Sequence, residues 1–315
     1  MPHRNSAQLG DHLEALLTGF PMARSLSWDP LGFVRPFRND PRAAEIAGVF
    51  AATVAVGNVK TIHADLQDLF QRMGGDPRGF LERFPSRTWR FRLAPWRHRW
   101  IRADQMGFLA LRLREVYENF PGGLQEVVEE GMRTPGAGSD MARGLDALSR
   151  SLRHGGLEAP RTFYEPPPGY AALFPSPLGP GHPACKRAAL FVRWMVRRTE
   201  PDLGLWTRIP PASLRIPLDT HIYWIARHLG LTRRKARDWT TVEEITEALR
   251  ALDPWDPVRF DFALAHTGIS GDCPKRRDIS VCGRCAVQPD CDLWAGRWRR
   301  TLPAVPTPLR MPTPP

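Results

Sequence analysis

Helical spacing of apolar residues is the feature that most constrains the fold of this chain. After Asp219, the residues Ile222, Ile225, Ala226 and Leu229 occupy the i, i+3, i+4 and i+7 positions of a single helical face. No run of alternating β-branched residues bounded by tight-turn dipeptides is present, so strands are not predicted. The sequence therefore predicts an all-α fold.

Helix-start signals predict further helices on both sides of this segment. Asp40 and Pro41 form a cap and first-turn pair for a helix that stops near Gly57, and Asn58 caps the next helix. Residues 134–183 are rich in Gly and Pro, which predicts loops around short helical pieces. Other helices are expected to start at Asp104, at about residue 184 (to about 198), at a capping box formed by Thr241 and Glu244, and at Asp256 with Pro257.

A chain of 315 residues can bury one large core or two modest ones. The helix signals divide it into four segments. The expected segments are an N-terminal segment (1–40) that packs with the C-terminal lobe, a central helical lobe (41–218) with a hairpin at about 175–187, and a C-terminal lobe (219–298) with a cysteine loop at 273–291. The proline-rich tail, 299–315, is expected to be disordered.

The charge balance favours a polyanionic partner. Lys and Arg number 44 against 33 Asp and Glu, which gives a net charge of +11. Residues 87–102 hold six arginines, one histidine and three tryptophans. The arginines suit phosphates, whereas Trp89, Trp96 and Trp100 could stack on bases or pack in the core. A generally basic, soluble surface is the alternative explanation of the charge.

Nothing in the sequence indicates a membrane or secreted protein. No stretch approaches the roughly 18 consecutive apolar residues of a membrane span, and the first residues lack the apolar centre of a signal peptide. The chain has five cysteines, an odd number, and four of them crowd into a short C-terminal stretch, unlike a disulfide framework. We therefore expect a cytoplasmic, monomeric protein with no membrane partner.

The four C-terminal cysteines have the spacing of a metal or cluster site. Cys273, Cys282, Cys285 and Cys291 are separated by eight, two and five residues, and Cys185 is left over. Four thiolates at this spacing bind either an iron–sulfur cubane or zinc. The loop also carries cations that a bound cluster would hold rigidly against a phosphate backbone, namely Lys275, Arg276, Arg277 and Arg284.

The segment PLDTHIYWIARHLGL, followed by a helix and this cysteine loop, resembles the endonuclease III group of helix-hairpin-helix DNA glycosylases. The likeness covers Asp219 to Cys291. It implies a two-lobed helix-hairpin-helix fold, a catalytic carboxylate at Asp219 and a [4Fe-4S] cluster on the four cysteines, with zinc as the alternative. The whole chain also resembles an uncharacterised bacterial family related to these glycosylases, through DPLGF, AVGNVKTI, FVRWMVRRTEPDLGLW and IPLDTH.

Upstream, PLGPGHPACKR offers Gly179 and Gly181 for the turn of the hairpin, where they would contact DNA. Lys186 follows this turn and precedes Asp219 by thirty-three residues, an interval similar to that of archaeal 8-oxoguanine glycosylases. The resemblance implies that Lys186 is the nucleophile. Its neighbour Arg187 is expected to contact DNA and to help keep the amine neutral.

Each expected role has a simpler alternative. A fixed carboxylate beside C1′ would stabilise the positive charge that develops as a glycosidic bond breaks, but Asp219 could also only cap its helix. Lys186 could contact phosphate from a basic helix that also carries Arg193 and Arg197. His221 is expected to support its helix start.

The expected function is removal of a damaged base from double-stranded DNA after the nucleotide is flipped into a pocket, with abasic-site lyase activity. Asn58, His182 and Trp206 are candidates for that pocket, although each could instead serve in packing, capping or a turn. Two other functions stay open. The chain could be a non-catalytic DNA-binding or damage-sensing protein, or a binder of RNA or the ribosome.

Overall fold

The computed structural model describes residues 6–84, 92–155, 165–274 and 276–297. These residues are mostly helical, which confirms the all-α prediction. Within them, the only strands are two short segments, β1 (Arg97–His98) and β2 (Ile101–Arg102), which pair antiparallel with Arg97 opposite Arg102. None of the helices in these ranges is long and apolar enough to cross a membrane. Trp89, Lys275 and the tail 299–315 lie outside the described residues.

Helices occupy most of the first half of the chain. They are α1 (Ser6–Thr18), α2 (Met22–Leu26), η1 (Pro30–Phe33), η2 (Arg35–Phe37), α3 (Pro41–Val54), α4 (Val59–Arg72), α5 (Pro77–Glu82), α7 (Ala103–Asn119), α8 (Gly123–Arg133) and α9 (Asp140–His154). The second half contains η3 (Tyr170–Leu173), α10 (Lys186–Val196), η4 (Pro211–Ser213), α11 (Thr220–His228), α12 (Trp239–Arg250), α13 (Asp261–Ile269), α14 (Ile279–Cys282) and η5 (Gln288–Asp290).

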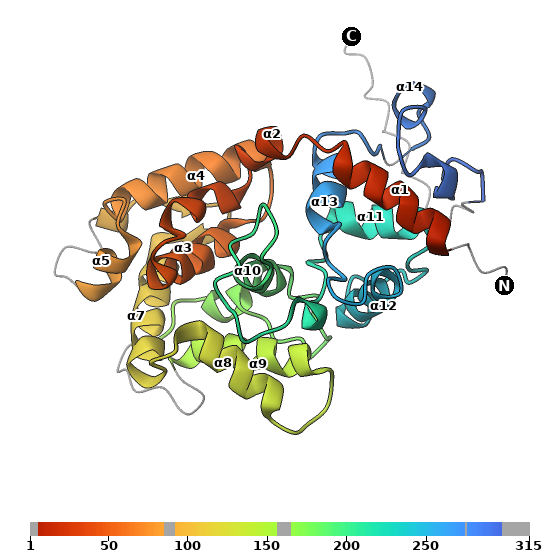
Figure 1. Cartoon of the computed structure of the whole chain (residues 1–315). Coiled ribbons are helices and arrows are strands. Elements are labelled where there is room, and N and C mark those ends of the chain that lie inside the picture. The colour runs from red at the N-terminus through yellow and green to blue at the C-terminus, as the bar shows by residue number, and fades with distance from the viewer. Residues whose placement is uncertain (1–5, 85–91, 156–164, 275, 298–315) are drawn as a thin grey trace, which may run out of the picture.

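Helix α10 lies at the centre of the molecule. In Figure 1, α3, α4, α5 and α7 lie on one side of it, and α11 to α14 lie on the other. The approach of α10 to α3 is close because α3 presents Gly48 at the contact, where a Cβ atom would lie 2.9 Å from both Phe191 and Met195. Trp194 of α10 is fully buried. The centre of the core is therefore a helix–helix contact that requires a residue without a side chain.

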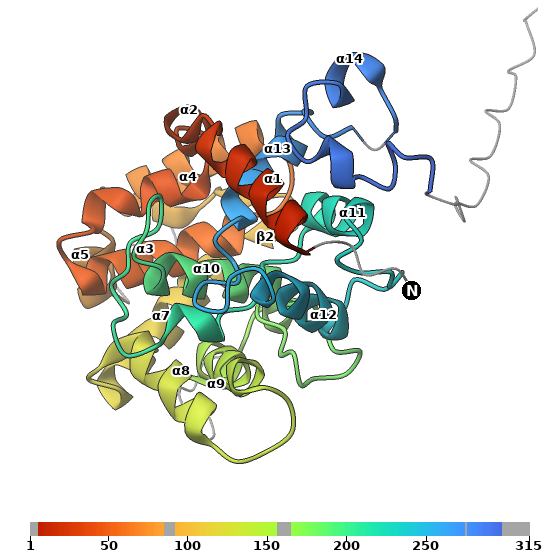
Figure 2. The same cartoon turned by 45° about the vertical axis from the view of Figure 1, so that its right-hand side comes forward.

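The N-terminal helix α1 lies beside the C-terminal helices, as Figures 1 and 2 both show. Just after α1, Phe20 makes an edge-to-face contact with Phe262 of α13, with ring centroids 5.9 Å apart. Glu14 of α1 forms an ion pair of 2.8 Å with Arg259. The two ends of the chain thus build one part of the molecule together.

The cap-based predictions were right for two helices. Asp40 accepts hydrogen bonds from the backbone of α3, and the side chain of Asn58 accepts one from the first turn of α4. The stretch after residue 134 contains one full helix, α9, where only short helical pieces between loops were expected. Its start is capped by Ser139, and Gly155 ends it in the left-handed conformation, with a φ of 80°.

Three helix starts were placed incorrectly. The cap of α12 is Asp238, whose carboxylate accepts from the backbone N–H of Thr241, so Thr241 lies inside the helix instead of before it. Helix α13 begins at Asp261, after a turn that contains Asp256 and Pro257. Helix α7 begins at Ala103, one residue before Asp104. At α13 the preceding residue is Phe260, whose side chain makes no capping hydrogen bond, so capping signals could not locate this start.

Candidate functional site

A cavity of about 600 Å³ lies where several parts of the chain meet, including Asp29 before η1 and the exposed arginines Arg99 and Arg237. Its walls come from the turn between α3 and α4, the first turn and body of α10, the start of α11, and α13. The ionisable and amide side chains that line it include Asp29, Asn58, Arg99, Lys186, Asp219 and His266. Two residues that the sequence singled out for catalysis, Lys186 and Asp219, therefore share one cavity.

Lys186 is the first residue of α10 and is partly buried. Its amine donates a hydrogen bond of 2.8 Å to the carbonyl oxygen of Ala55 at the end of α3, and it forms no ion pair within the described residues. Burial lowers the pKa of Lys186, while the negative charges of Asp219, Asp29 and Asp261 act against this shift, and Arg187 adds to it. The amine is therefore more easily deprotonated than that of an exposed lysine.

Asp219 caps α11 with one of its two carboxylate oxygens. Oδ1 accepts hydrogen bonds of 2.8 Å from the backbone N–H groups of both His221 and Ile222. Oδ2 has no hydrogen bond among the described residues. The capping role is thus present, and it leaves the second oxygen available to the cavity.

A close contact between α11 and α13 fixes this helix start. A Cβ atom on Gly268 of α13 would lie 2.6 Å from the Cβ atom of His221, so only glycine allows the two helices to approach so closely. The backbone N–H of His221 donates to Asp219, and its side chain packs closely against Gly268 of α13. It accordingly supports the start of α11, as predicted from its position.

Arg193 and Arg197 of α10 are buried and bound to aspartates, which argues against a basic phosphate-binding face on this helix. Arg193 pairs with Asp261 and, at 3.2 Å, with Asp202. Arg197 pairs with Asp202 at 2.6 Å and with Asp256 at 2.8 Å. These charges are therefore used inside the protein.

Arg187 is also held from within. Its guanidinium donates to the carbonyl oxygens of Ala172 at 3.0 Å and Thr53 at 3.5 Å, and burial lowers its pKa to about 10. These bonds join α10 to η3 and to the end of α3.

Two exposed arginines at the rim of the cavity have no carboxylate partner within the described ranges: Arg99 and Arg237. The side chain of Arg99 passes over Gly57, where a Cβ atom would lie 2.9 Å from the guanidinium. The backbone of Gly57 has a φ of 119°, which also favours glycine at this position. Arg237 donates to the hydroxyl of Thr220 at 3.3 Å. The sequence analysis missed Arg237, although the basic run RRKAR at 233–237 marks it.

The predicted hairpin turn does not line the cavity. The N–H of Gly179 donates to the carbonyl of Ser176 at 3.1 Å, and Gly181 has a φ of 74° with open space where a Cβ atom would lie. His182 accepts a backbone hydrogen bond of 2.6 Å from Trp239, so the turn is docked against the start of α12. Gly181 is exposed and Gly179 is partly buried, and His182 does not line the cavity.

Of the other aromatic and amide candidates, only Asn58 reaches the cavity. Trp206 is buried in the core and donates a hydrogen bond of 2.7 Å to Glu45. Trp96 is also buried, with its indole N–H bonded to the carbonyl of Asp65 at 2.8 Å. Trp100 is 42% exposed and available at the surface.

All four C-terminal cysteines line one small cavity of about 30 Å³ beside α11. Burial and the neighbouring thiols raise the pKa of Cys273 to about 12. In the part of the chain that the structure describes, no three His, Cys, Asp or Glu side chains are arranged to hold one metal ion. His228 and Asp272 also line this cavity, and four thiols are the donor set typical of an iron–sulfur cluster. Arg276, Arg277 and Arg284 are exposed around it.

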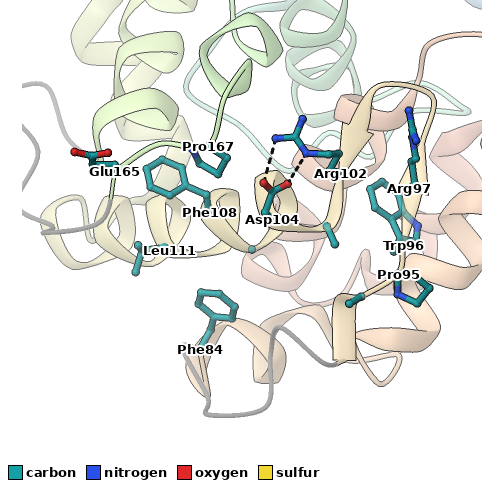
Figure 3. A pocket seen from close by; sticks show the side chains of 13 residues that line it. Phe84, Pro95, Trp96, Arg97, Arg102, Asp104, Phe108, Leu111, Glu165 and Pro167 are labelled. Atoms are coloured by element: carbon teal, nitrogen blue, oxygen red, sulfur yellow. Dashed lines mark hydrogen bonds and ion pairs between the residues drawn. The ribbon is translucent and has the colours of Figure 1, made fainter.

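A second hollow of about 580 Å³ lies between α5 and α7 and is mostly apolar (Figure 3). Phe84, Trp96 and Phe108 line it, and Arg102 and Asp104 form an ion pair of 3.1 Å at its edge. These two charges satisfy each other, and the described part of the lining contains no lysine, histidine or cysteine that could act as a nucleophile or a base near neutral pH. The cavity that contains Lys186 and Asp219 is the stronger candidate site.

Residues 29–270 match the family described as "Protein of unknown function (DUF2400)", so the chain belongs to that family. No curated protein and no solved structure matches it. The expected membership of the helix-hairpin-helix DNA glycosylases was wrong, because the match is to this family and not to theirs. An Asp-capped helix start and a four-cysteine loop are local solutions that unrelated chains can share, so these motifs were too short to identify a family.

Proposed function

We propose that this protein is a DNA-repair enzyme, a DNA N-glycosylase with abasic-site lyase activity that acts on double-stranded DNA containing a damaged base. The observation that carries the proposal is the pairing of Lys186, an amine whose pKa is lowered by burial, with the free Oδ2 of Asp219 in one cavity. An amine nucleophile and a carboxylate are the groups that substitution at C1′ of a sugar requires. The proposal does not depend on family membership.

The chemistry follows from these two groups. The neutral amine of Lys186 attacks C1′, and the electron pair of the C1′–N bond leaves with the base, which takes up a proton. Opening of the sugar ring then gives a protonated Schiff base between Lys186 and C1′. Throughout, the carboxylate of Asp219 stabilises positive charge on the sugar, while its other oxygen keeps the group in place by capping α11.

The dimensions and rim of the cavity suit a flipped nucleotide. Its volume of about 600 Å³ lies in the range of small-molecule sites. Arg99 and Arg237 at the rim are unpaired cations that would contact the phosphates on either side of the flipped nucleotide. The turn that contains Gly179 and the exposed Gly181 would contact the backbone further along the duplex, as the hairpin of a two-lobed DNA-binding fold.

We also propose that Cys273, Cys282, Cys285 and Cys291 hold a [4Fe-4S] cluster, with zinc as the alternative. The support is that all four thiols line one cavity. The cluster would supply rigidity, so that Arg276, Arg277 and Arg284 face the DNA backbone.

Spectroscopy tests the cluster. Protein purified without oxygen should absorb near roughly 400 nm and contain iron and sulfide. Replacement of Cys282 or Cys285 by Ser should remove the absorbance. Cys185→Ser is the matched control, because Cys185 lies in the hairpin and bonds only to backbone carbonyls. Zinc without iron in the purified protein would contradict the iron–sulfur assignment.

Borohydride trapping tests the catalytic proposal. The protein is incubated with a duplex that carries one abasic site, and with a panel of duplexes that carry damaged bases, and borohydride reduces any Schiff base to a permanent crosslink. We expect a crosslink with the wild-type protein and its loss in Asp219→Asn on the base-containing duplexes. Tight binding without a crosslink or base release would instead support a damage-sensing protein, and preferential binding of RNA at matched salt would exclude a DNA substrate.

A further inference from the structure

A histidine–aspartate pair lies in the wall of the same cavity as Lys186 and Asp219. His266 of α13 and Asp29, the residue before η1, are 237 positions apart in the sequence, and Nε2 of the ring lies 2.9 Å from Oδ2 of the carboxylate. The ring is also packed against Phe262 in the preceding turn of the helix, with centroids 4.3 Å apart. Both its position and its orientation are therefore fixed.

The state of Asp29 determines which nitrogen of His266 carries the proton. Burial acts to raise the pKa of Asp29, but the hydrogen bond from His266 and the backbone N–H of Leu31, which lies at 2.8 Å, act to lower it, and the pKa is lowered overall. An ionised carboxylate can only accept, so Nε2 of His266 must donate to it. The unprotonated nitrogen of the neutral ring is then Nδ1, which has no hydrogen bond in the described residues. Nδ1 is therefore free to accept a proton.

Two other histidine–aspartate pairs show that this arrangement is not general. His98 bonds to Asp65 through Nδ1 at 2.6 Å and to the carbonyl of Val56 through Nε2 at 2.9 Å, so both its nitrogens are occupied. His12 bonds to Asp290 at 2.6 Å but does not line the cavity. Of the three pairs, only His266 with Asp29 combines a free nitrogen with a place in the cavity wall.

We propose that His266, oriented by Asp29, is the base that removes the C2′ proton in the elimination step. This inference rests on the proposed function. The C2′–H electron pair forms a C1′–C2′ double bond and neutralises the iminium nitrogen of the adduct with Lys186. The resulting enamine expels the 3′-phosphate with the electrons of the C3′–O bond. Nδ1 takes the proton, the Asp29 carboxylate stabilises the imidazolium, and water later releases Lys186.

The proposal separates two steps that single-turnover kinetics can measure independently. On a duplex with one abasic site, borohydride trapping reports formation of the adduct, and strand cleavage reports elimination. We expect His266→Gln, which keeps a hydrogen-bond donor for Asp29, to trap at a rate within about fivefold of wild type. The same variant should cleave at least about 100-fold more slowly. Asp29→Asn should slow cleavage with a smaller loss, because the ring remains but loses its orienting charge.

The control is His12→Gln, which removes a histidine–aspartate pair away from the cavity and should change neither rate. Chemical rescue provides a second readout in case the first variant folds poorly. His266→Ala should cleave slowly in buffer and recover at least about tenfold with added imidazole, which a purely structural role for His266 would not produce.

Several outcomes would overturn the inference. Equal losses of trapping and cleavage in His266→Gln would show that the residue only positions the site, and unchanged cleavage would show that it has no role in elimination. Failure of imidazole to restore cleavage in His266→Ala would also count against it. Absence of trapping in the wild-type protein is a different result, because it rejects the proposed function itself.

Discussion

The first and last turns of α10 hold their cations in different ways. Lys186 and Arg193 lie two helical turns apart and line the same cavity, so they share one face of the helix. Lys186 is bonded to one backbone carbonyl, and burial lowers its pKa. Arg193 is bonded to two aspartates. Burial acts to lower the pKa of Arg193, but the negative charges of these aspartates raise it overall.

This difference shows that the partners of a buried cation decide its role. A carbonyl satisfies a donor without supplying a full negative charge, so the amine of Lys186 can lose its proton and react. Two carboxylates lock the guanidinium of Arg193 as a charged structural group that joins α10 to α13. The following predictions test whether the two ends of α10 are functionally as distinct as their partners indicate.

The largest effect is expected at Lys186. Lys186→Gln should lower the rate of borohydride trapping by at least about a thousandfold, because the nucleophile is removed. The amide can still donate to the carbonyl of Ala55, so the free energy of unfolding should stay within about 1 kcal/mol of wild type. Chemical denaturation measures the second quantity, and a large loss of stability would make Lys186 a structural cation like Arg193.

Arg193 should show the opposite pattern. Arg193→Met leaves Asp261 buried without its ion-pair partner and leaves Asp202 with Arg197 alone, so the free energy of unfolding should fall by about 3–5 kcal/mol. Arg114→Met, at an exposed ion pair with Glu118, is the control and should lose less than about 1 kcal/mol. A stable Arg193→Met protein would mean that the aspartates do not need this charge.

The pH dependence of trapping sharpens the contrast. The adduct forms only from the neutral amine, so its rate should rise about tenfold per pH unit while Lys186 is mostly protonated. Because burial lowers the pKa of Lys186, the rate should level off at a pH below about 10.4, the ordinary value for lysine. A rate that still rises beyond that pH would show an amine as basic as an exposed one.

The smallest effects are expected at the rim. Arg99→Ala and Arg237→Ala should each weaken duplex binding by several-fold at low salt and reduce the slope of log affinity against log salt by about 1. Stability should not change, since neither guanidinium forms an ion pair among the described residues. Arg133→Ala, an exposed arginine paired with Glu129 on α8, is the control. Equal effects at all three positions would indicate only non-specific attraction.

The sequence predicted some features of the site and missed others for a physical reason. The side chain of Asp219 is placed by its own helix start, and local capping signals are visible in sequence. His266 and Asp29 were not predicted, because nothing near either residue in the chain indicates the other. Trp206 was predicted for the pocket, but its partner Glu45 lies 161 positions away and holds it in the core.

The sequence by itself determined the helical class, the caps of α3, α4 and α11, and the spacing of the four cysteines, because each depends on residues a few positions apart. Only the tertiary structure decided which charges are neutralised and which face the cavity. Arginines on one helix look alike in sequence, and burial beside aspartates from distant segments separates them. Short-range geometry fixes the elements, whereas the electrostatics of the site arises where distant segments meet.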